Sequence, residues 1–438
     1  MKKRTAITVI SLLSCAAIFA NGQAEKGAAS QGTKKDAPVA VAPTLKTADG
    51  KTELVFWTRI NDKFENEIAA FEATHPDVSI KRVGIGSDYD DLQTKYIASS
   101  ASGELPHVGL VSQRYGIPQL YDAGVIVPME RLMSDAEKAD VYDAFWGRYT
   151  YKGEKVALPF QVSMPVLYVN LDMLQAKGLA IPTTWEEMMD TAQKLATDTN
   201  GDGKIDVYGL GIPSDAPWYL NGFYKSNGAQ VVKGDKEVNI DQPAVVKILK
   251  DIQSMASNGA LAPNQHATAK DDFKNQTVVM LLNSCAGNGS IAKGVKDRFK
   301  YAMVHLPTIN GKINAPLGGN GMAVFKSNPE MEALSYEFVK FMISPESFSG
   351  FSLEKGYVPV TKSAMKAEKV QQRVNDPFWA ETFKQLDYLY GQPINPVDAT
   401  IWKDVNDILS KIEADPKADV AKLVKGMQSD VDDFLLDY

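Results

Sequence analysis

Apolar residues follow two different spacings along most of the chain. The run Leu54-Val55-Phe56-Trp57 is typical of a short buried strand, and Phe64, Ile68 and Phe71 then repeat at the spacing of a helix. His75-Pro76 ends this predicted helix, because the residue before a proline disfavours the helical conformation. The pattern therefore predicts a strand followed by a helix.

Strands and helices continue to alternate after this first pair. Val78, Ile80 and Val83 alternate as a second strand, and Thr184-Trp185-Glu186-Glu187 has the form of a capping box that opens a helix. Further strands are predicted at 108–111, 166–169, 278–282 and 323–325, and further helices around Leu92 and Tyr96, at 332–342 and through most of 402–438. This alternation predicts the α/β class, with mainly parallel sheets flanked by helices.

The first residues have the composition of a targeting segment. Three basic residues, at 2–4, precede the uncharged run 5–20, so we expect a cleaved signal peptide over residues 1–20 and export to the periplasm. Leu12-Leu13-Ser14-Cys15 offers an alternative, in which Cys15 carries a lipid that tethers the protein to a membrane. An uncleaved membrane anchor is a third interpretation. Residues 21–50 have few large apolar side chains, and we expect a flexible leader there.

Composition and charge narrow the class of protein. The chain has 438 residues, 44% of them hydrophobic, which is enough to bury the cores of two or three domains of about 150 residues each. The 47 basic and 54 acidic residues give a net charge of −7, which argues against nucleic acid as a partner. Only Cys15 and Cys285 are present, which excludes a disulfide scaffold and a multi-cysteine metal site.

Catalytic and cofactor motifs are missing from the sequence. The four histidines show no His-Glu-x-x-His spacing, and neither a nucleophile elbow nor a phosphate-binding or dinucleotide-binding glycine loop is present. Cys285 adjoins an apolar strand and is more typical of packing than of catalysis. We therefore expect no catalytic residues and no cofactor. A glycosidase-like pair of carboxylates is an alternative that the many acidic residues leave open.

One segment partly matches a calcium-binding loop. Asp198, Asn200, Asp202 and Asp206 occupy its positions 1, 3, 5 and 9, but position 12, which should be a bidentate glutamate, is Gly209. The alternative is a polar turn that leads into a strand. Because the loss of the glutamate removes two oxygen ligands, we favour the turn and expect no metal site.

Aromatic residues in polar surroundings are the more informative candidates. Trp57 ends the first predicted strand, Trp218 lies in a polar segment, Tyr357 lies in a glycine- and proline-containing turn, and Trp402 begins a helix. An aromatic face can stack on the C–H face of a sugar ring, but each of these residues alone is more typical of a core than of a ligand site. The position of Trp57 is the one at which open parallel sheets place ligands, beyond the carboxyl end of a strand.

Six segments follow one another in a fixed order between residue 51 and about residue 430: LVFWTRINDKFENEIAAFEATHPDVSI, SGELPHVGLV, LPFQVSMPVLYVNLDML, IPTTWEEMMDTAQKLA, GGNGMAVFKSNPEMEALSYEFVKFMISPE and KGYVPVTKSA. In order and spacing they resemble the extracellular solute-binding proteins of ABC importers, family 1, which carry sugars and related solutes. The resemblance implies two α/β lobes joined by crossovers, with the ligand in the cleft. It assigns residues 51–162 and 307–352 to one lobe and residues 163–306 and 353–438 to the other. It implies hinges at 160–165, 305–307 and 356–359.

The segments PFQVSMPVLYVN and SDYDDLQTKYIASSASGELPHV are most similar to the glycerol-3-phosphate-binding branch of that family. Gln113 stands where the branch has a glutamate, and Trp402 stands where it has its phosphate-binding arginine. The resemblance implies ligand contacts at Tyr89, Gln113, Ser163, Ser284 or Ser290, Gly319, Tyr357 and Trp402.

The exchange at position 402 changes the expected ligand. A guanidinium is the natural partner of a phosphate, whereas an indole has no charge but a large stacking face. We therefore favour a neutral carbohydrate or polyol over glycerol 3-phosphate, although Arg59 or Arg114 could compensate. In this hypothesis Trp57, Trp218 and Trp402 stack against the ligand, and polar side chains bind its hydroxyls.

The expected function is that of a monomeric binding protein. Closure of the hinge around the ligand produces a form that the transmembrane subunits of an ABC permease recognise. A secreted carbohydrate-active enzyme, an adhesin or a chemoreceptor partner are the rival interpretations. An iron-binding protein is a further rival, but it needs a cluster of Tyr, His and carboxylate ligands that the sequence does not suggest.

Overall fold

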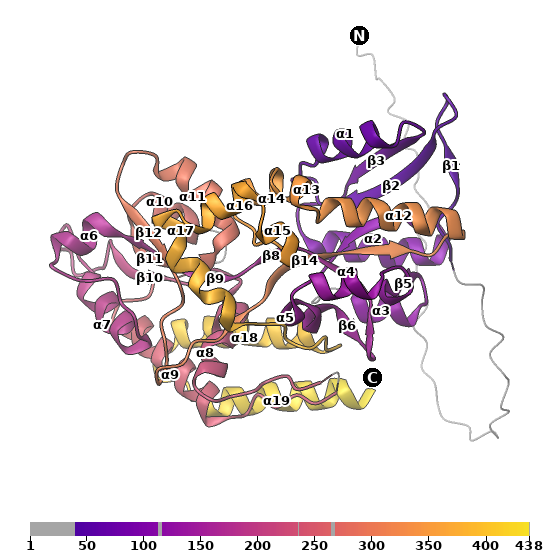
Figure 1. Ribbon diagram of the computed structural model, residues 1–438. Coiled ribbons are helices and arrows are strands. Elements are labelled where there is room, and N and C mark those ends of the chain that lie inside the picture. Colours follow the sequence, from indigo (N-terminus) through magenta and orange to yellow (C-terminus); the bar gives the residue numbers. More distant parts are fainter. Residues whose placement is uncertain (1–39, 113–115, 235, 264–267, 438) are drawn as a thin grey trace, which may run out of the picture. The chain divides into compact units, whose positions relative to one another are not determined.

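Two mixed β-sheets organise the part of the chain that the structure describes. The structure is a computed structural model and describes residues 40–112, 116–234, 236–263 and 268–437. One sheet has seven strands and the other has four, and helices pack on both (Figure 1). Cys15, Gln113 and Arg114 and the predicted signal peptide lie outside the described residues.

The seven-stranded sheet has the order β1-β2-β4-β14-β5, with β3 added to β2 and β8 added to β14. Its strands are β1 (Leu45–Lys46), β2 (Thr52–Thr58), β3 (Val78–Gly84), β4 (Val108–Val111), β5 (Ile126–Val127), β8 (Leu158–Ser163) and β14 (Gly318–Phe325). β2 is parallel to β3 and β4, whereas β14 is antiparallel to β4, β5 and β8.

The four-stranded sheet has the order β10-β11-β9-β12. Its strands are β9 (Pro165–Asn170), β10 (Tyr208–Gly211), β11 (Val278–Ser284) and β12 (Tyr301–Val304). Only the β10–β11 pair is parallel, because β9 enters the sheet antiparallel to both of its neighbours. The predicted α/β class is confirmed, but the sheets are mixed rather than mainly parallel, since β9 and β14 arrive from the other sheet in the reverse direction.

Side chains on the two faces of β2 show why the sheet is covered on both sides. Phe56 contacts Phe64 and Phe338 on one face, with ring centroids 5.8 and 5.3 Å away. Trp57, the next residue, stacks on Tyr96 of α2 (Tyr89–Ser102) with 5.4 Å between ring centroids. Successive strand residues point to opposite faces, so the apolar run that predicted a buried strand supplies one core on each side.

Helices of the first sheet include α1 and α12, which contact β3 and β14, and α2, which contacts β4 (Figure 1). The helices nearest this sheet in the sequence are α1 (Glu65–Thr74), α2 (Tyr89–Ser102), α3 (Ile117–Asp122), α4 (Asp135–Asp140), α5 (Asp143–Trp146), α12 (Pro329–Met342), α13 (Pro345–Phe348) and α14 (Phe351–Lys355), with the 3-10 turns η1 (Met129–Arg131) and η2 (Gly147–Tyr149). The short pair β6 (Thr150–Tyr151) and β7 (Glu154–Lys155) precedes β8.

Three of the helices on the second sheet each contact mainly a different strand: α7 contacts β10, α10 contacts β11 and α17 contacts β12. The remaining helices are α6 (Leu171–Ala176), α7 (Trp185–Leu195), α8 (Ala216–Ser226), α9 (Pro243–Ser257), α10 (Ala269–Lys274), α11 (Asn288–Val295), α15 (Lys362–Met365), α16 (Glu368–Val374), α17 (Pro377–Phe383), α18 (Asp398–Ala414) and α19 (Val420–Asp437), with η3 (Cys285–Gly287) and η4 (Lys384–Tyr388). The predicted capping box opens α7, with Thr184 and Glu187 making both of its reciprocal hydrogen bonds.

The chain crosses between the sheets near three points. The first crossing is at Met164, the single residue between β8 and β9. The third follows α14, where the backbone N–H of Val358 donates to the Val162 carbonyl. The second crossover lies later than the expected hinge at 305–307. Thr308 exchanges backbone hydrogen bonds with residues 183 and 185 of the second lobe, and the chain then passes through β13 (Ala315–Pro316), paired with β15 (Leu389–Tyr390), before β14.

Residues 40–50 correct the expected flexible leader. β1 pairs with β2, and Ala42 is buried and donates a backbone hydrogen bond to the Lys326 carbonyl. His107 anchors the same segment, since its Nδ1 accepts from the Val55 N–H at 2.8 Å and its Nε2 lies 2.7 Å from the Pro43 carbonyl. Small and polar side chains predicted disorder here, but backbone hydrogen bonds hold the segment. The rest of the leader lies outside the described residues.

Helices that could cross a membrane are not found in the described part of the chain, because none there is both long enough and apolar enough.

Candidate functional site

A cavity of about 420 Å³ lies where strands of both sheets end. Arg59 follows β2, Ser112 follows β4, and Ser163 and Ser284 are the last residues of β8 and β11; all four side chains line the cavity. In α/β folds the carboxyl ends of strands converge on the ligand site. The other lining residues are Asp88, Tyr89, Arg148, Asp215, Trp218, Lys270, Asn283, Ala286, Gly287, Gly318, Gly319, Tyr357 and Trp402.

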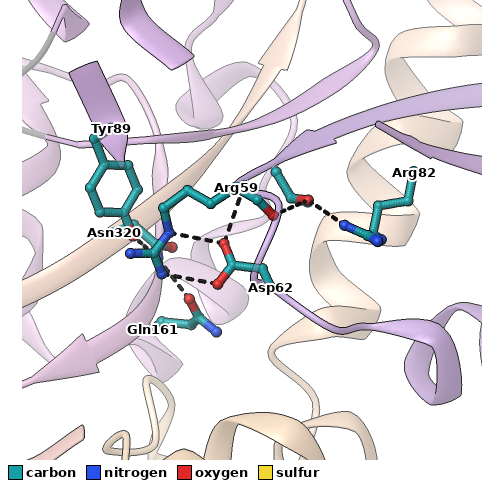
Figure 2. Close-up of polar contacts among 7 residues, drawn as sticks. Arg59, Asp62, Arg82, Tyr89, Gln161 and Asn320 are labelled. Atoms are coloured by element: carbon teal, nitrogen blue, oxygen red, sulfur yellow. Dashed lines mark hydrogen bonds and ion pairs between the residues drawn. The ribbon is translucent and has the colours of Figure 1, made fainter. Parts of the chain in front are cut away.

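Arg59 is held in place by Asp62 at one side of this cavity. Its Nε donates to Oδ2 of Asp62 at 3.1 Å and its Nη2 donates to Oδ1 at 2.9 Å, as Figure 2 shows. These two hydrogen bonds make the pair bidentate, and because Asp62 is buried the pair is largely removed from water. Burial alone would lower the pKa of Arg59, but Tyr89 and Asp62 reverse this effect and the pKa is raised. The Arg59 side chain therefore stays protonated, and the carboxylate of Asp62 balances its positive charge.

The loop that carries Arg59 is fixed from behind. The hydroxyl of Thr58 accepts from Nη1 of Arg82 at 3.1 Å and donates to the Arg59 carbonyl at 3.0 Å (Figure 2). Thr58 is fully buried, so this chain of contacts ties the end of β2 to the neighbouring strand β3. The backbone that presents Arg59 to the cavity is thus hydrogen-bonded on both sides.

Tyr89 lies against the Arg59 guanidinium. The guanidinium carbon is 4.5 Å from the Tyr89 ring centroid, a cation–π contact. The Asn320 amide donates to the Tyr89 hydroxyl at 2.6 Å and to Oε1 of Gln161 at 2.8 Å, and both amide residues are fully buried (Figure 2). Burial raises the pKa of Tyr89 and Arg59 opposes the rise. Tyr89 therefore presents a neutral, oriented phenol.

Trp218 reaches the cavity from α8. Its Nε1 donates to the carbonyls of Pro316 and Leu317, at 3.1 and 3.2 Å, where the chain crosses to β14. A Cβ atom on Gly318 would lie 2.3 Å from Cζ2 of this indole and 2.6 Å from the Ser163 hydroxyl. The hydrogen bonds of Nε1 thus fix the indole, and its ring packs against the backbone of Gly318, where a larger residue would clash with it.

Gly319 and Tyr357 complete the side of the cavity formed by the crossovers. Gly319 has φ +100°, and a Cβ atom there would lie 1.7 Å from the Gln161 carbonyl oxygen, so this position requires glycine. Tyr357 follows α14, and burial together with neighbouring Tyr89 raises the pKa of its hydroxyl. Tyr357 therefore stays neutral and adds a second phenol to the cavity.

A side pocket of about 60 Å³ adjoins the main cavity. Arg148, Trp218 and Trp402 line both spaces, so they stand at the boundary between them. Trp402 comes from α18, the long helix near the C-terminus. Asn221, Gln392 and Asp398 add polar groups to the side pocket.

Most of the site residues predicted from the sequence come together at the main cavity. Tyr89, Ser163, Trp218, Ser284, Gly319, Tyr357 and Trp402 all line it. Gln113 lies outside the described residues. Ser290 is exposed on α11 and does not line the cavity, so of the two alternative serines only Ser284 does.

Trp57 is, beside Ser290, a predicted site residue that the structure places away from the cavity. It is 6% exposed, stacks on Tyr96 and does not line the cavity. This position does not support the expectation that Trp57 stacks on the ligand, because at this point of β2 the alternation of side chains turns Trp57 toward α2. Arg59, two residues later, occupies the expected position beyond the strand.

Several lining residues were not among the predicted contacts. Ser112 and Asn283 lie at strand ends, so their positions could have been inferred from the strand pattern. Arg148, Asp215 and Lys270 come from helical or loop segments far apart in the sequence. Nothing in their local sequence distinguishes them from surface residues.

The calcium-like segment forms a tight polar loop. Oδ1 of Asp198 accepts from the N–H of Gly201 at 2.7 Å, and Oδ2 of Asp206 accepts from Thr199 at 2.9 Å. These carboxylates serve the loop's own backbone. No group of three or more His, Cys, Asp or Glu side chains suited to a metal ion occurs among the described residues.

Cys285 is buried and does not line the cavity, although its neighbours Ser284 and Ala286 do. Its Sγ accepts from the Met164 N–H at 3.4 Å, and burial raises the pKa of the thiol to about 11. A buried, protonated thiol is a poor nucleophile. Cys285 is therefore a packing residue at the first crossover.

Comparison with known proteins identifies relatives over most of the chain. The family described as bacterial extracellular solute-binding protein matches residues 67–377. The sn-glycerol-3-phosphate-binding periplasmic protein UgpB of Rhizobium meliloti (strain 1021) is 26% identical over 343 residues, which cover 74% of this chain and 78% of the relative. The putative ABC transporter periplasmic-binding protein YcjN of Escherichia coli (strain K12) is 26% identical over half of each chain.

Solved structures share the fold. UgpB from Mycobacterium tuberculosis, in complex with glycerophosphocholine, superposes with a TM-score of 0.76 at 23% identity, over 89% of this chain and 99% of that one. MalE from Bdellovibrio bacteriovorus, bound to maltotriose, gives a TM-score of 0.73 at 16% identity, over 87% and 99%. The predicted two-lobed periplasmic-binding-protein fold is thereby confirmed.

Proposed function

Because this chain belongs to the bacterial extracellular solute-binding proteins, we propose that it captures a carbohydrate or polyol and delivers it to the membrane permease of an ABC importer. The observation that carries this proposal is the composition of the cavity. Trp218, Trp402 and Tyr357 offer aromatic faces, and Ser112, Ser163 and Asn283 offer hydrogen-bonding groups beside them. A sugar needs both kinds of contact.

Capture depends on contacts with both lobes at once. Arg59 and Tyr89 come from the lobe of the seven-stranded sheet, whereas Trp218 and Ser284 come from the other. A ligand that touches both sets binds a closed arrangement more tightly and shifts the population toward it. We place the hinge at the crossovers near Met164, Leu317 and Gly356, and we expect the permease to recognise the closed form.

Glycerol 3-phosphate or a glycerophosphodiester is the second candidate ligand. The Rhizobium meliloti relative is named for glycerol 3-phosphate, and the Mycobacterium tuberculosis structure holds glycerophosphocholine. Arg148 and Lys270 add positive charge to this cavity. We place a carbohydrate first because Trp402 and Trp218 together offer more stacking surface than a glycerol backbone can use.

The remaining aspects of the proposal concern partners and location. We propose a monomer, exported through a signal peptide at residues 1–20, with lipidation of Cys15 as the alternative.

We also propose binding without turnover. Incubation with oligosaccharides should release no new reducing ends; steady release of reducing ends would instead identify a secreted carbohydrate-active enzyme.

Tryptophan fluorescence of the purified chain tests the ligand class directly, because two indoles line the cavity. Titration with glucose, maltose, maltotriose and glycerol, beside glycerol 3-phosphate, should give a saturable change with at least one sugar or polyol. Saturable binding of glycerol 3-phosphate with no response to any sugar or polyol would reverse the order of the two candidates. No response to either class would contradict the proposed function.

A further inference from the structure

Arg148 brings into the cavity a positive charge that the described side chains do not neutralise. It lies in η2, is half-buried, and lines both the main cavity and the side pocket. None of the ion pairs among the described residues includes it. A guanidinium that is partly removed from water and lacks a counter-ion favours an anion nearby.

The hydrogen bonds of Arg148 leave part of its donor set unused. Its Nη1 donates to the Leu317 carbonyl at 2.6 Å, which fixes the direction of the side chain. Its Nε is buried and has no hydrogen-bond partner. A guanidinium has five donors in a planar fork, so one carbonyl satisfies little of its capacity.

Arg59 provides the contrast within the same cavity. Its guanidinium is paired with Asp62 through two hydrogen bonds, at 3.1 and 2.9 Å, so its charge is already balanced. Arg148 donates to the neutral Leu317 carbonyl and forms no ion pair among the described residues. Of the two arginines that line the cavity among the described residues, Arg148 is therefore the one that forms no ion pair there.

On the basis of the proposed function, we propose that Arg148 binds an anionic substituent of the ligand, a carboxylate or a phosphate group, between Trp218 and Trp402. Both indoles line the same two spaces as Arg148, so a sugar or polyol stacked on them brings its substituent to the guanidinium. Arginine matches planar and tetrahedral oxyanions with paired N–H donors. The expectation of an uncharged ligand rested on Trp402 alone, and Arg148 supplies the charge from another element.

Other charged groups at the cavity do not cancel this effect. Among the described lining residues, Lys270 is exposed on α10 and adds a second positive charge, while Asp88 and Asp215 are the carboxylates. Asp88 caps α2 by accepting from the Asp91 N–H at 3.0 Å. Neither carboxylate forms an ion pair with Arg148. Arg148 therefore keeps a charge that no ion pair among the described residues balances.

Matched pairs of probes test this assignment on the full chain. D-glucuronate and D-glucose form one pair, and glycerol 3-phosphate and glycerol form the other, so the carboxylate and phosphate sources are tested separately. We expect the anionic member of at least one pair to bind at least about tenfold more tightly than its neutral partner. Arg148→Gln should abolish this preference, and Arg148→Lys should retain part of it. Arg131→Gln, which removes an exposed arginine remote from the cavity, is the control.

Each outcome decides the proposal. Equal affinity for the two members of both pairs, or a preference that survives in Arg148→Gln, would overturn the anion site and leave the capture of a carbohydrate intact. A purely structural role predicts that Arg148→Gln weakens the anionic and neutral members equally, which would also overturn it. Failure of all four probes to bind would overturn the proposed function together with the inference. Thermal melting of each variant separates loss of binding from loss of folding.

Discussion

A Cβ atom on Gly318 would lie 2.3 Å from Cζ2 of Trp218, so the indole occupies space that only glycine leaves open. We predict that Gly318→Ala displaces the indole and weakens ligand binding. Overpacking by one methyl group costs about 1 to 3 kcal/mol, so affinity in a fluorescence titration should fall at least about fivefold. Gly426→Ala, at a position with open space around it, should leave affinity unchanged. Equal affinities of Gly318→Ala and the wild type would contradict the role of Trp218.

Trp402→Ala should reduce binding but not folding. Trp402 is only partly buried on α18 and lines both the main cavity and the side pocket, so its removal opens the site without emptying a core. Loss of an aromatic contact at the centre of a site costs about 2 kcal/mol, or roughly 30-fold in affinity. Calorimetric titration measures this loss, and circular dichroism should show an unchanged melting temperature. Wild-type affinity would remove Trp402 from the site.

Trp57→Ala should show the opposite result. Trp57 is 6% exposed and stacks on Tyr96, so its truncation creates a cavity in the core of the first sheet. We expect the free energy of unfolding to fall by about 3 to 5 kcal/mol, as measured by urea denaturation. Any protein that remains folded should bind ligand with nearly normal affinity. A stable variant that binds poorly would return Trp57 to the ligand site.

These two tryptophans show how far the sequence could predict the site. The strand at 54–57, the capping box of α7 and the helices near the C-terminus were recoverable, because hydrophobic spacing and capping chemistry are local. Trp57 and Trp402 look alike as single residues, and only tertiary packing decides which one is covered. Arg148 lies 169 positions from Leu317, its hydrogen-bond partner, so no local pattern could connect them. The order of β14 within the first sheet is equally non-local.

Asp62→Asn should destabilise the protein. The substitution leaves the Arg59 guanidinium without its counter-ion, while Tyr89 and the cavity wall still surround it. Because Arg59 keeps some contact with water, we expect a loss of about 2 kcal/mol in the free energy of unfolding, below the range for fully buried pairs. Asp190→Asn breaks a surface pair with Lys194 and should cost much less. Equal losses in the two variants would contradict this account of Arg59.

Stability should fall as the pH drops below about 6.5, the ordinary pKa of histidine, because of His107. Burial lowers the pKa of this imidazole in the folded state, while the Pro43 carbonyl and Glu53 oppose the shift. The folded pKa therefore lies below the unfolded one. The stabilisation is fully present above the unfolded pKa and is lost as the pH falls toward the folded value.

The geometry explains this direction. Nδ1 of His107 accepts from the Val55 N–H, and a second proton on the ring would place two donors face to face. Melting temperatures measured from pH 8 to pH 5 should decline more steeply in the wild type than in His107→Gln, whose amide oxygen can accept without titrating. His75→Gln, at a partly exposed position, is the control. Parallel pH profiles for wild type and His107→Gln would show that His107 does not titrate in this range.

Mass spectrometry of the small molecules released when the purified chain is denatured tests the central claim most directly. We predict that the wild type releases a sugar, sugar derivative or polyol in near-stoichiometric amount. Trp402→Ala, purified in the same way, should release much less. A stoichiometric ligand of another chemical class, or equal amounts of ligand from the two proteins, would contradict the assignment of this cavity to such a solute.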